Sequence, residues 1–166
     1  SAAFVEDLVR SGVKAVRVFP GTMNWSLAEW CSGPLLTALE NRKVPVLMPF
    51  GETNLNELYA VLGSHPDLPV ILTGVQYTVN RMLYPLLQAR PNLYVDLSPR
   101  YTVERGIEEI CRCFGAERLL FGTNWPFSES GAAITYLAYA GISEPERQQI
   151  AACNLSRLLN NIKEQI

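Results

Sequence analysis

The chain has 166 residues, a formal net charge of −2 and 48% hydrophobic residues, which fits one folded domain over residues 1–166 and excludes a disordered chain. The near-neutral charge excludes the basic face that a binder of the nucleic-acid backbone needs. No apolar run in the sequence reaches the roughly 18 residues that span a membrane, so we expect neither a nucleic-acid partner nor a membrane segment.

The cysteine pattern predicts a cytoplasmic protein with reduced thiols. Four cysteines stand at scattered positions: Cys31, Cys111, Cys113 and Cys153. The first ten residues carry Glu6 and Asp7 and lack the layout of a secretory signal. No second pair accompanies Cys111 and Cys113 to complete a zinc site. We therefore interpret these two residues as small buried side chains.

The first third of the chain predicts a helix, a strand and a long loop. An opening helix covers residues 4–10 and ends at Gly12, and a strand follows over residues 15–19. The stretch from Pro20 to Gly33 is the longest irregular segment. We expect Trp25 and Trp30 to pack this loop onto the body of the protein.

The middle of the chain predicts two strand–helix units. A strand over residues 44–48 precedes Asn54, a good N-cap for a helix with apolar residues at helical spacing. A strand over residues 70–73 precedes a second apolar stripe over residues 79–87. Because Pro85 lies inside that stripe, we expect the helix to be kinked or restarted there.

The last third predicts two more strands and a closing helix. After a strand over residues 93–97, Thr102 can cap a helix that Gly115 ends. A strand covers residues 119–122, and Ser143 with Glu146 forms a capping box. That box opens the closing helix, which is expected to bury four apolar residues: Ile150, Leu155, Leu158 and Leu159.

These alternating units predict an α/β fold with about five parallel strands. The strands begin every 23 to 29 residues and are largely apolar between Gly and Pro residues, as is typical of parallel strands buried on both faces. A doubly wound sheet or part of a (β/α)₈ barrel would fit. None of the strand ends carries the G-x-G-x-x-G phosphate turn of the former. We therefore expect a partial, TIM-barrel-like (β/α)₈ sheet whose strands are consecutive neighbours.

Five segments around the strands, above all GAERLLFGTNWP at residues 115–126, match a known family in order. The segments cover residues 12–20, 44–47, 66–72, 91–98 and 115–126. With the closing helix, they resemble the amidohydrolase-related family of TIM-barrel metal-dependent hydrolases and decarboxylases. The resemblance implies that the strands correspond to barrel strands four to eight. The family's first three strands, including the His-x-His of strand one, have no counterpart in this chain.

The resemblance also implies a divalent metal such as zinc, which acidifies a water and polarises a substrate carbonyl. The family's ligand positions that fall within this chain are substituted. They are occupied by Met48 or Pro49 after the second predicted strand, Gly74 after the third, and Asn124 in place of the family's Asp. These residue types cannot build a three-ligand site. We therefore expect no metal cofactor.

Candidate site residues follow the strands. The resemblance places a ligand pocket at the carboxyl ends of the strands, and its candidate ligand-binding residues are Arg17, Gln76, Tyr77, Asn124 and Trp125, with Asn24 and Arg100 on neighbouring loops. Arg17 either binds an anion at the barrel mouth or pairs with an acid in the wall. The catalytic candidates are Glu52, Asp96 and Asn124, although a solvated or capping role for Glu52 and structural hydrogen bonding for Asp96 are the favoured interpretations.

Three functional hypotheses remain open. The first is a family member that has lost its metal and binds a small polar or carbonyl-containing ligand. The second is an active hydrolase or lyase that uses Glu52, Asp96 and Arg17. The third is a non-enzymatic scaffold or assembly protein. His65, the only histidine, is expected at a loop or helix end on the opposite rim. Because five units leave two free sheet edges, we also expect an oligomer or a fragment of a longer chain.

Overall fold

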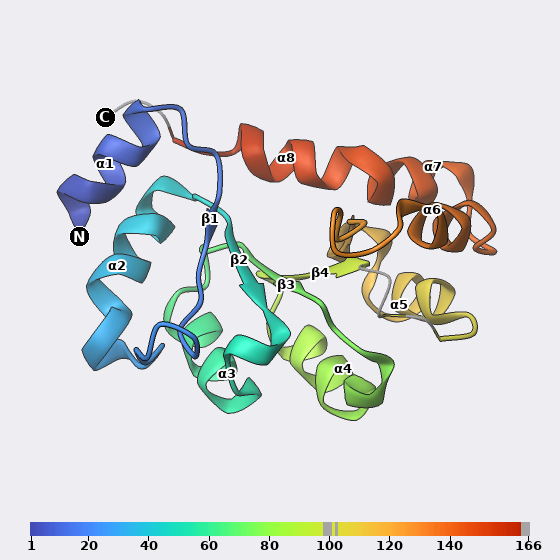
Figure 1. Cartoon of the computed structure of the whole chain (residues 1–166), viewed down its shortest axis with the longest axis horizontal. Helices are drawn as coiled ribbons and strands as arrows, with labels where there is room; N and C mark the ends of the chain where they lie inside the picture. Colours follow the sequence, from blue (N-terminus) through green and yellow to red (C-terminus); the bar gives the residue numbers. More distant parts are fainter. Residues whose placement is uncertain (98–100, 102, 164–166) are drawn as a thin grey trace.

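The computed structural model describes residues 1–97, 101 and 103–163, in which helices and strands alternate along the chain (Figure 1). The strands are β1 (Val16–Arg17), β2 (Val46–Pro49), β3 (Val70–Thr73), β4 (Leu93–Leu97) and β5 (Leu119–Phe121). The α-helices are α1 (Ala2–Arg10), α2 (Glu29–Arg42), α3 (Leu55–Ser64), α4 (Asn80–Ala89), α5 (Gly106–Phe114), α6 (Ser130–Ala138), α7 (Glu144–Gln148) and α8 (Asn154–Asn160). Three 3₁₀ turns and one π-helical turn complete the set: η1 (Phe50–Glu52), η2 (Tyr77–Val79), η3 (Ala116–Arg118) and η4 (Gln149–Cys153).

The five strands form one parallel sheet in the order β1-β2-β3-β4-β5. This confirms the predicted α/β class and the consecutive strand order of a partial barrel. β1 is shorter than predicted, with two residues in the ladder. It is held to β2 by backbone hydrogen bonds from Val16 to Pro45 and from Val18 to Leu47, both of 3.0 Å.

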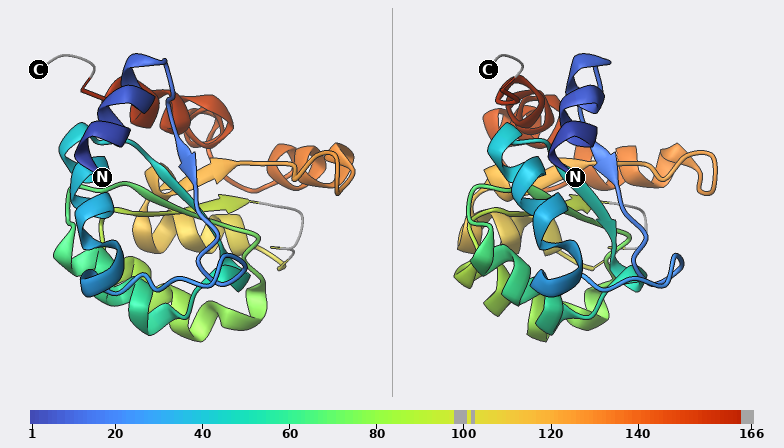
Figure 2. Two further views of the ribbon diagram at one scale, coloured as in Figure 1. Left: turned by 60° about the vertical axis from the view of Figure 1, so that its left-hand side comes forward. Right: turned by 90° about the vertical axis from the view of Figure 1, so that its left-hand side faces the viewer.

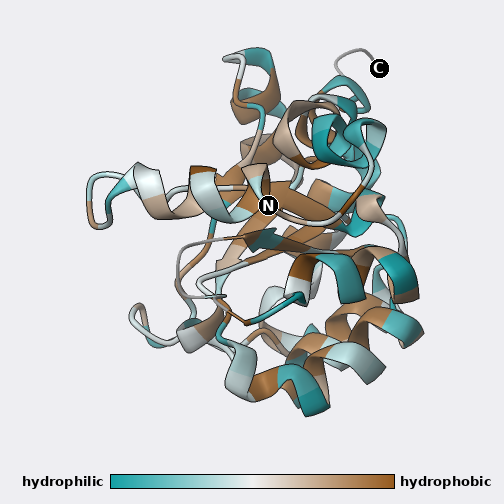
Figure 3. Ribbon diagram, turned by 90° about the vertical axis from the view of Figure 1, so that its right-hand side faces the viewer, coloured by the Kyte–Doolittle hydropathy of each residue, from teal (hydrophilic) through white to brown (hydrophobic). Residues whose placement is uncertain are grey.

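The alternation of side chains along each strand divides the interior into two layers. One face of the sheet, with residues such as Val46 and Leu72, belongs to the main core beneath the helices. The other face carries a smaller cluster of Ile71, Leu120 and Leu158, the last from α8. Figure 3 shows the hydrophobic strands at the centre of the molecule, with hydrophilic colours on the outer surfaces of the helices.

Helices surround the sheet on both sides. In Figures 1 and 2, α2 to α5 follow the outer side of the curved sheet, and α8 lies across the opposite side. Arg42 at the end of α2 forms an ion pair with Glu6 of α1, and its backbone carbonyl accepts from the Lys163 amide at 3.0 Å. The two ends of the described chain are thereby fastened to the same helix.

Helix α2 corrects the predicted loop. The loop after β1 ends at Ala28, because α2 begins at Glu29, whereas the expectation extended the loop to Gly33. Gly33 and Pro34 both lie inside α2, in its second turn. Trp25 packs against the core as expected, but Trp30 is 82% exposed and does not anchor the loop.

The next helices follow the predicted caps in part. The Asn54 side chain accepts from the Glu57 amide at 2.8 Å, as predicted for the N-cap of α3. α4 runs without interruption through Pro85, which excludes the restart, one of the two alternatives expected there. α5 begins at Gly106 after Arg105, whereas the predicted cap, Thr102, lies outside the described residues.

In the C-terminal third, the sequence pattern did not predict α6 but did predict the start of α7. α6 was not predicted, because its sequence has no regular apolar stripe. The Ser143–Glu146 capping box is present at the start of α7, and the helix continues through a π-helical turn into α8. Cys111 is buried as expected, but Cys113 is exposed on α5. No helix within the described ranges is both long and apolar enough to cross a bilayer.

Candidate functional site at the carboxyl ends of the strands

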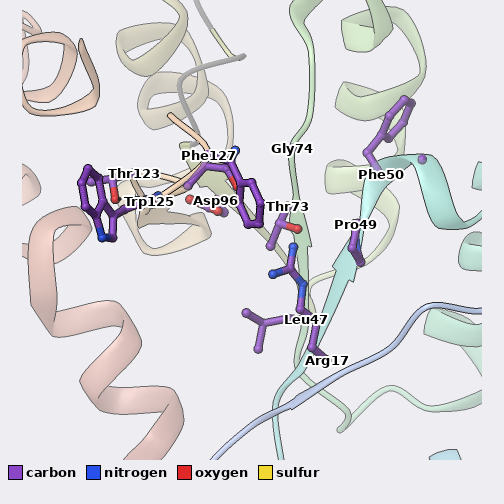
Figure 4. Close-up of a pocket in the computed structure, with 12 residues that line it drawn as sticks. Arg17, Leu47, Pro49, Phe50, Thr73, Gly74, Asp96, Thr123, Trp125 and Phe127 are labelled. Atoms are coloured by element: carbon purple, nitrogen blue, oxygen red, sulfur yellow. Dashed lines mark hydrogen bonds between the residues drawn. The ribbon is translucent and has the colours of Figure 1, made fainter. Parts of the chain in front are cut away.

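A cavity of about 420 Å³ opens at the carboxyl ends of the strands (Figure 4). The described residues that line it are Arg17, Leu47, Pro49, Phe50, Gly51, Thr73, Gly74, Asp96, Thr123, Asn124, Trp125 and Phe127. They come from all five strands or from the segments that directly follow them. In parallel α/β sheets this edge is where ligands bind, because the loops there vary over a packed core.

The sheet register places the polar side chains of the cavity. Pro49 pairs with Thr73 in the β2–β3 ladder, and Ile71 with Tyr94 in the next. Thr73 and Asp96 lie two residues further along their strands than Ile71 and Tyr94, so they point to the same face. The cavity floor therefore combines a hydroxyl and a carboxyl group.

Asp96 is the most perturbed group of the cavity. Its Oδ1 atom is buried and has no hydrogen-bond partner. Burial raises the pKa of this carboxyl from 3.8 to about 6, although the charge of Arg17 opposes the rise. Gly122 lies directly against it, because a Cβ built on Gly122 would come within 2.0 Å of Asp96 Oδ1. The expected structural hydrogen bond of Asp96 is thus missing at Oδ1, although the residue lines the cavity.

Arg17 extends from β1 into the same cavity. In Figure 4 its guanidinium points toward the end of β3, where Thr73 lies. The Arg17 guanidinium carbon also lies 5.3 Å from the centre of the Phe19 ring. Arg17 therefore lines the mouth, and its charge acts on Asp96 in the wall.

The segment after β5 forms one rim of the cavity. Asn124 adopts a left-handed backbone conformation with φ of 56°, which asparagine tolerates better than most residues. Its carbonyl accepts from the Phe127 and Ser128 amides, and its side-chain amide donates to Ser128 Oγ at 3.3 Å. Trp125 and Phe127 are 72% and 85% exposed, so the rim presents two aromatic rings to solvent.

Three predicted site residues lie outside this set. Gln76 and Tyr77 are exposed at the start of η2 and are not among the described residues that line the cavity. The Glu52 carboxylate accepts from the Thr22 amide at 2.7 Å and from the Thr22 hydroxyl at 2.6 Å. These hydrogen bonds lower the pKa of Glu52. Its observed contacts fasten the loop after β1.

The other predicted residues are placed as follows. Asn24 has a φ of 56° and is not among the described lining residues, and Arg100 lies outside the described residues. His65 is buried at the end of α3, as expected for a helix-end residue. Its ring nitrogens lie 2.9 Å from Glu40 and 3.1 Å from Glu29, both on α2.

The residues at the family's metal-ligand positions do not fit a metal. Met48 is fully buried in the main core, and Gly74 has no side chain. Asn124 offers an amide where a carboxylate would be needed to hold a cation firmly. Within the described part of the chain, no group of three His, Cys, Asp or Glu side chains could hold a metal ion.

Several lining residues were not among the predicted site residues, among them Leu47, Phe50, Gly51, Thr123 and Phe127. Leu47 could have been found, because it lies one residue before the predicted end of its strand and alternation turns it to the same side as Pro49. Phe50 and Phe127 lie in a turn and a loop, whose paths depend on tertiary packing. Gly122 is a neighbour of Asp96 that only the register of β4 with β5 identifies.

Solved structures with this architecture are TIM-barrel proteins. The chain matches a TIM-barrel protein from Bordetella bronchiseptica with a TM-score of 0.79 and 24% identity, over 96% of this chain and 61% of the other. It matches 5-carboxyvanillate decarboxylase from Sphingomonas paucimobilis with a TM-score of 0.72 and 13% identity, over 98% and 63%. An amidohydrolase from Mycobacterium avium subsp. paratuberculosis K-10 gives 0.68 and 18%, over 95% and 54%.

These similarities establish the fold, and the chain spans less than two thirds of the length of each of these structures. None of the curated proteins compared with the chain matches it. The family model described as Amidohydrolase matches residues 1–160, which is nearly the whole sequence. The chain therefore belongs to the amidohydrolase family.

Proposed function

We propose that this chain forms a pocket that binds a small polar or carbonyl-containing ligand without a divalent metal held by the protein. The observation that carries the proposal is the cavity itself, which Arg17, Thr73, Asp96 and Asn124 line with polar groups, while no group of three His, Cys, Asp or Glu side chains among the described residues could hold a metal ion. Hydrogen-bond donors and one cation can polarise or orient a carbonyl or carboxylate group without a metal.

The size and lining of the cavity support a small ligand. A volume of about 420 Å³ falls in the lower part of the range of small-molecule sites, roughly 300–1,000 Å³. Leu47, Pro49 and Phe50 supply apolar surface, and Arg17 supplies the charge. The matched structures are longer than this chain. Any activity of a longer protein that contains this chain is therefore also only proposed.

The test is metal analysis combined with ligand binding. The purified protein is expected to contain well under one equivalent of zinc or manganese and to bind small carbonyl compounds or carboxylates in an NMR titration. Arg17→Met should weaken binding, whereas Tyr77→Phe, at an exposed position outside the cavity lining, should leave binding unchanged. Stoichiometric metal at the carboxyl ends of the strands, or equal binding by both variants, would contradict the proposal.

A second candidate is a metal-independent hydrolase or lyase. The observation in its favour is that the pKa of Asp96 is raised to about 6 in the cavity, which suits a group that transfers protons near neutral pH. In this candidate Asp96 acts as the general acid or base and Arg17 stabilises a developing negative charge. Loss of turnover with retained ligand binding in Asp96→Asn would distinguish it from a binding-only pocket.

A further inference from the structure

Two charged groups of opposite sign share the cavity. Arg17 and Asp96 are the charged side chains among the described lining residues. The neighbouring polar groups, Thr73 on β3 and Asn124 after β5, do not titrate at ordinary pH. Among the described residues, the charge of Arg17 acts on the ionisation of Asp96 and lowers its pKa, against the larger effect of burial. The charge state of Asp96 therefore depends on what else Arg17 binds.

The ionised form of Asp96 has little stabilisation from its surroundings. Its Oδ1 atom is buried without a partner, and an unpaired buried charge is costly. Gly122, which directly follows β5, packs so closely against this oxygen that a Cβ there would lie 2.0 Å from it, so backbone closes one side of the carboxyl group. Asp96 also lines the cavity, and a ligand in the cavity approaches its carboxyl group from that other side.

An anion that binds Arg17 changes this balance. Its negative charge cancels the field of Arg17 and adds a like charge close to Asp96, and both effects favour protonation of the carboxyl group. A protonated Asp96 has an O–H donor that can point to an oxygen of the same anion. Anion binding and proton binding must then strengthen each other to the same extent, because coupling between two binding events is reciprocal.

We propose that the pocket takes up a small organic anion together with one proton, with Arg17 holding the anion's charge and Asp96 donating the captured proton to one of its oxygens. This inference rests on the proposed function, since it assigns the ligand of the same pocket to one chemical class, the carboxylates and similar oxyanions. Gly122 is the positioning residue that leaves room for the carboxyl group of Asp96.

A matched pair of probes tests the inference. Propionate carries the anionic group, and propionamide is a neutral molecule of nearly the same shape. Binding is followed by NMR titration, and proton uptake by a pH-stat during the same additions. We expect propionate to bind with uptake of nearly one proton per site at pH 7, and its affinity to fall roughly tenfold per pH unit above neutral pH. Propionamide should bind with no proton uptake.

Variants separate the two charged groups. Asp96→Asn keeps a donor at the same place, so propionate binding should persist with no proton uptake and little dependence on pH between 6 and 8. Arg17→Met should abolish binding of propionate more than that of propionamide. Folding of each variant is checked by circular dichroism.

The outcomes distinguish this inference from the proposed function. Propionate that binds wild-type protein without proton uptake, or with equal affinity at pH 6 and pH 8, overturns the inference and leaves a ligand pocket in place. Proton uptake that persists in Asp96→Asn overturns the assignment to Asp96. Absence of binding by both probes, in protein that is folded, overturns the pocket and the inference together.

Discussion

At the scale of single residues, Asp96 should weaken the folded state at neutral pH. Its pKa is raised from 3.8 to about 6 by burial, so the folded protein binds this proton more tightly than the unfolded chain does. Stability from this group is therefore fully present below about pH 4 and is lost as the pH rises from about 4 to about 6. A shift of this size corresponds to at most about 3 kcal/mol.

Asp96→Asn should therefore stabilise the protein at pH 7. We expect the free energy of unfolding to rise by about 1–3 kcal/mol at pH 7, because an amide avoids the cost of a buried charge, and to change little at pH 4. Urea unfolding of the variant and the wild type at both pH values measures this difference. An equal effect at pH 4 and pH 7 would show that the charge of Asp96 is not its cause.

Asn124 permits a second test at this scale. Asn124→Asp restores the carboxylate of the family at one position, but Gly74 still offers no ligand and Met48 remains buried in the core. A single added carboxylate should bring neither stoichiometric zinc nor metal-dependent hydrolysis. Metal content after dialysis against zinc, with wild-type protein as the control, is the measurement. One equivalent of tightly held zinc in the variant would contradict our expectation.

At the scale of secondary-structure elements, His65 joins α2 to the end of α3. Its ring lies between Glu40 and Glu29, and Glu40 also accepts from the Asp67 amide at 2.9 Å. The Glu40 side chain is 17% exposed and that of Glu29 is 59% exposed. A contact is worth more where water is excluded, so Glu40 should contribute more than Glu29.

We expect a ranked loss of stability in this cluster. His65→Ala should cost about 2–4 kcal/mol, because it removes the partner of one carboxylate oxygen of the half-buried Glu40 and opens a cavity. Glu40→Ala should cost about 1–3 kcal/mol and Glu29→Ala less than about 1 kcal/mol. Chemical unfolding gives the three values. A larger loss for Glu29→Ala than for Glu40→Ala would show that burial does not set the strength of these contacts.

Elements with local signals were predictable from sequence, and those without them were not. The starts of α3 and α7 could be predicted from Asn54 and Ser143. A helix cap is a contact between residues within one turn, so its signal is local in the sequence. The start of α2 was missed because Gly33 and Pro34, residue types common in loops, lie inside the helix. Tertiary packing can override such local preferences, and it is visible only in three dimensions.

The same distinction applies to the candidate site. Arg17, Asp96 and Asn124 lie on or directly after strands, and a parallel sheet brings all strand ends to one edge, so their meeting was predictable. Gln76 and Tyr77 follow β3 just as closely, but Gly74 with φ of 71° turns the chain before them. The direction of that turn could not be read from residue types alone.

At the scale of the whole molecule, the sheet ends in two strands that pair on one side only within the described residues, β1 and β5. Free strand edges pair readily with other chains. We expect the 166-residue protein to associate in solution, and light scattering over a concentration series measures the mass. A stable, soluble monomer at all concentrations would contradict the prediction that another chain pairs with these strand edges.

The consecutive order of the strands also sets how the molecule can open. Each strand pairs only with its neighbours in sequence, so units can detach one at a time from either end of the sheet while the centre persists. The two-residue β1 is the weakest end, and it carries Arg17, the cation of the cavity. Amide hydrogen exchange should therefore be fastest at β1 and slowest at β3. A ligand that binds Arg17 should slow hydrogen exchange at the Val16 and Val18 amides. Ligand binding in the pocket would then stabilise β1 at the edge of the sheet.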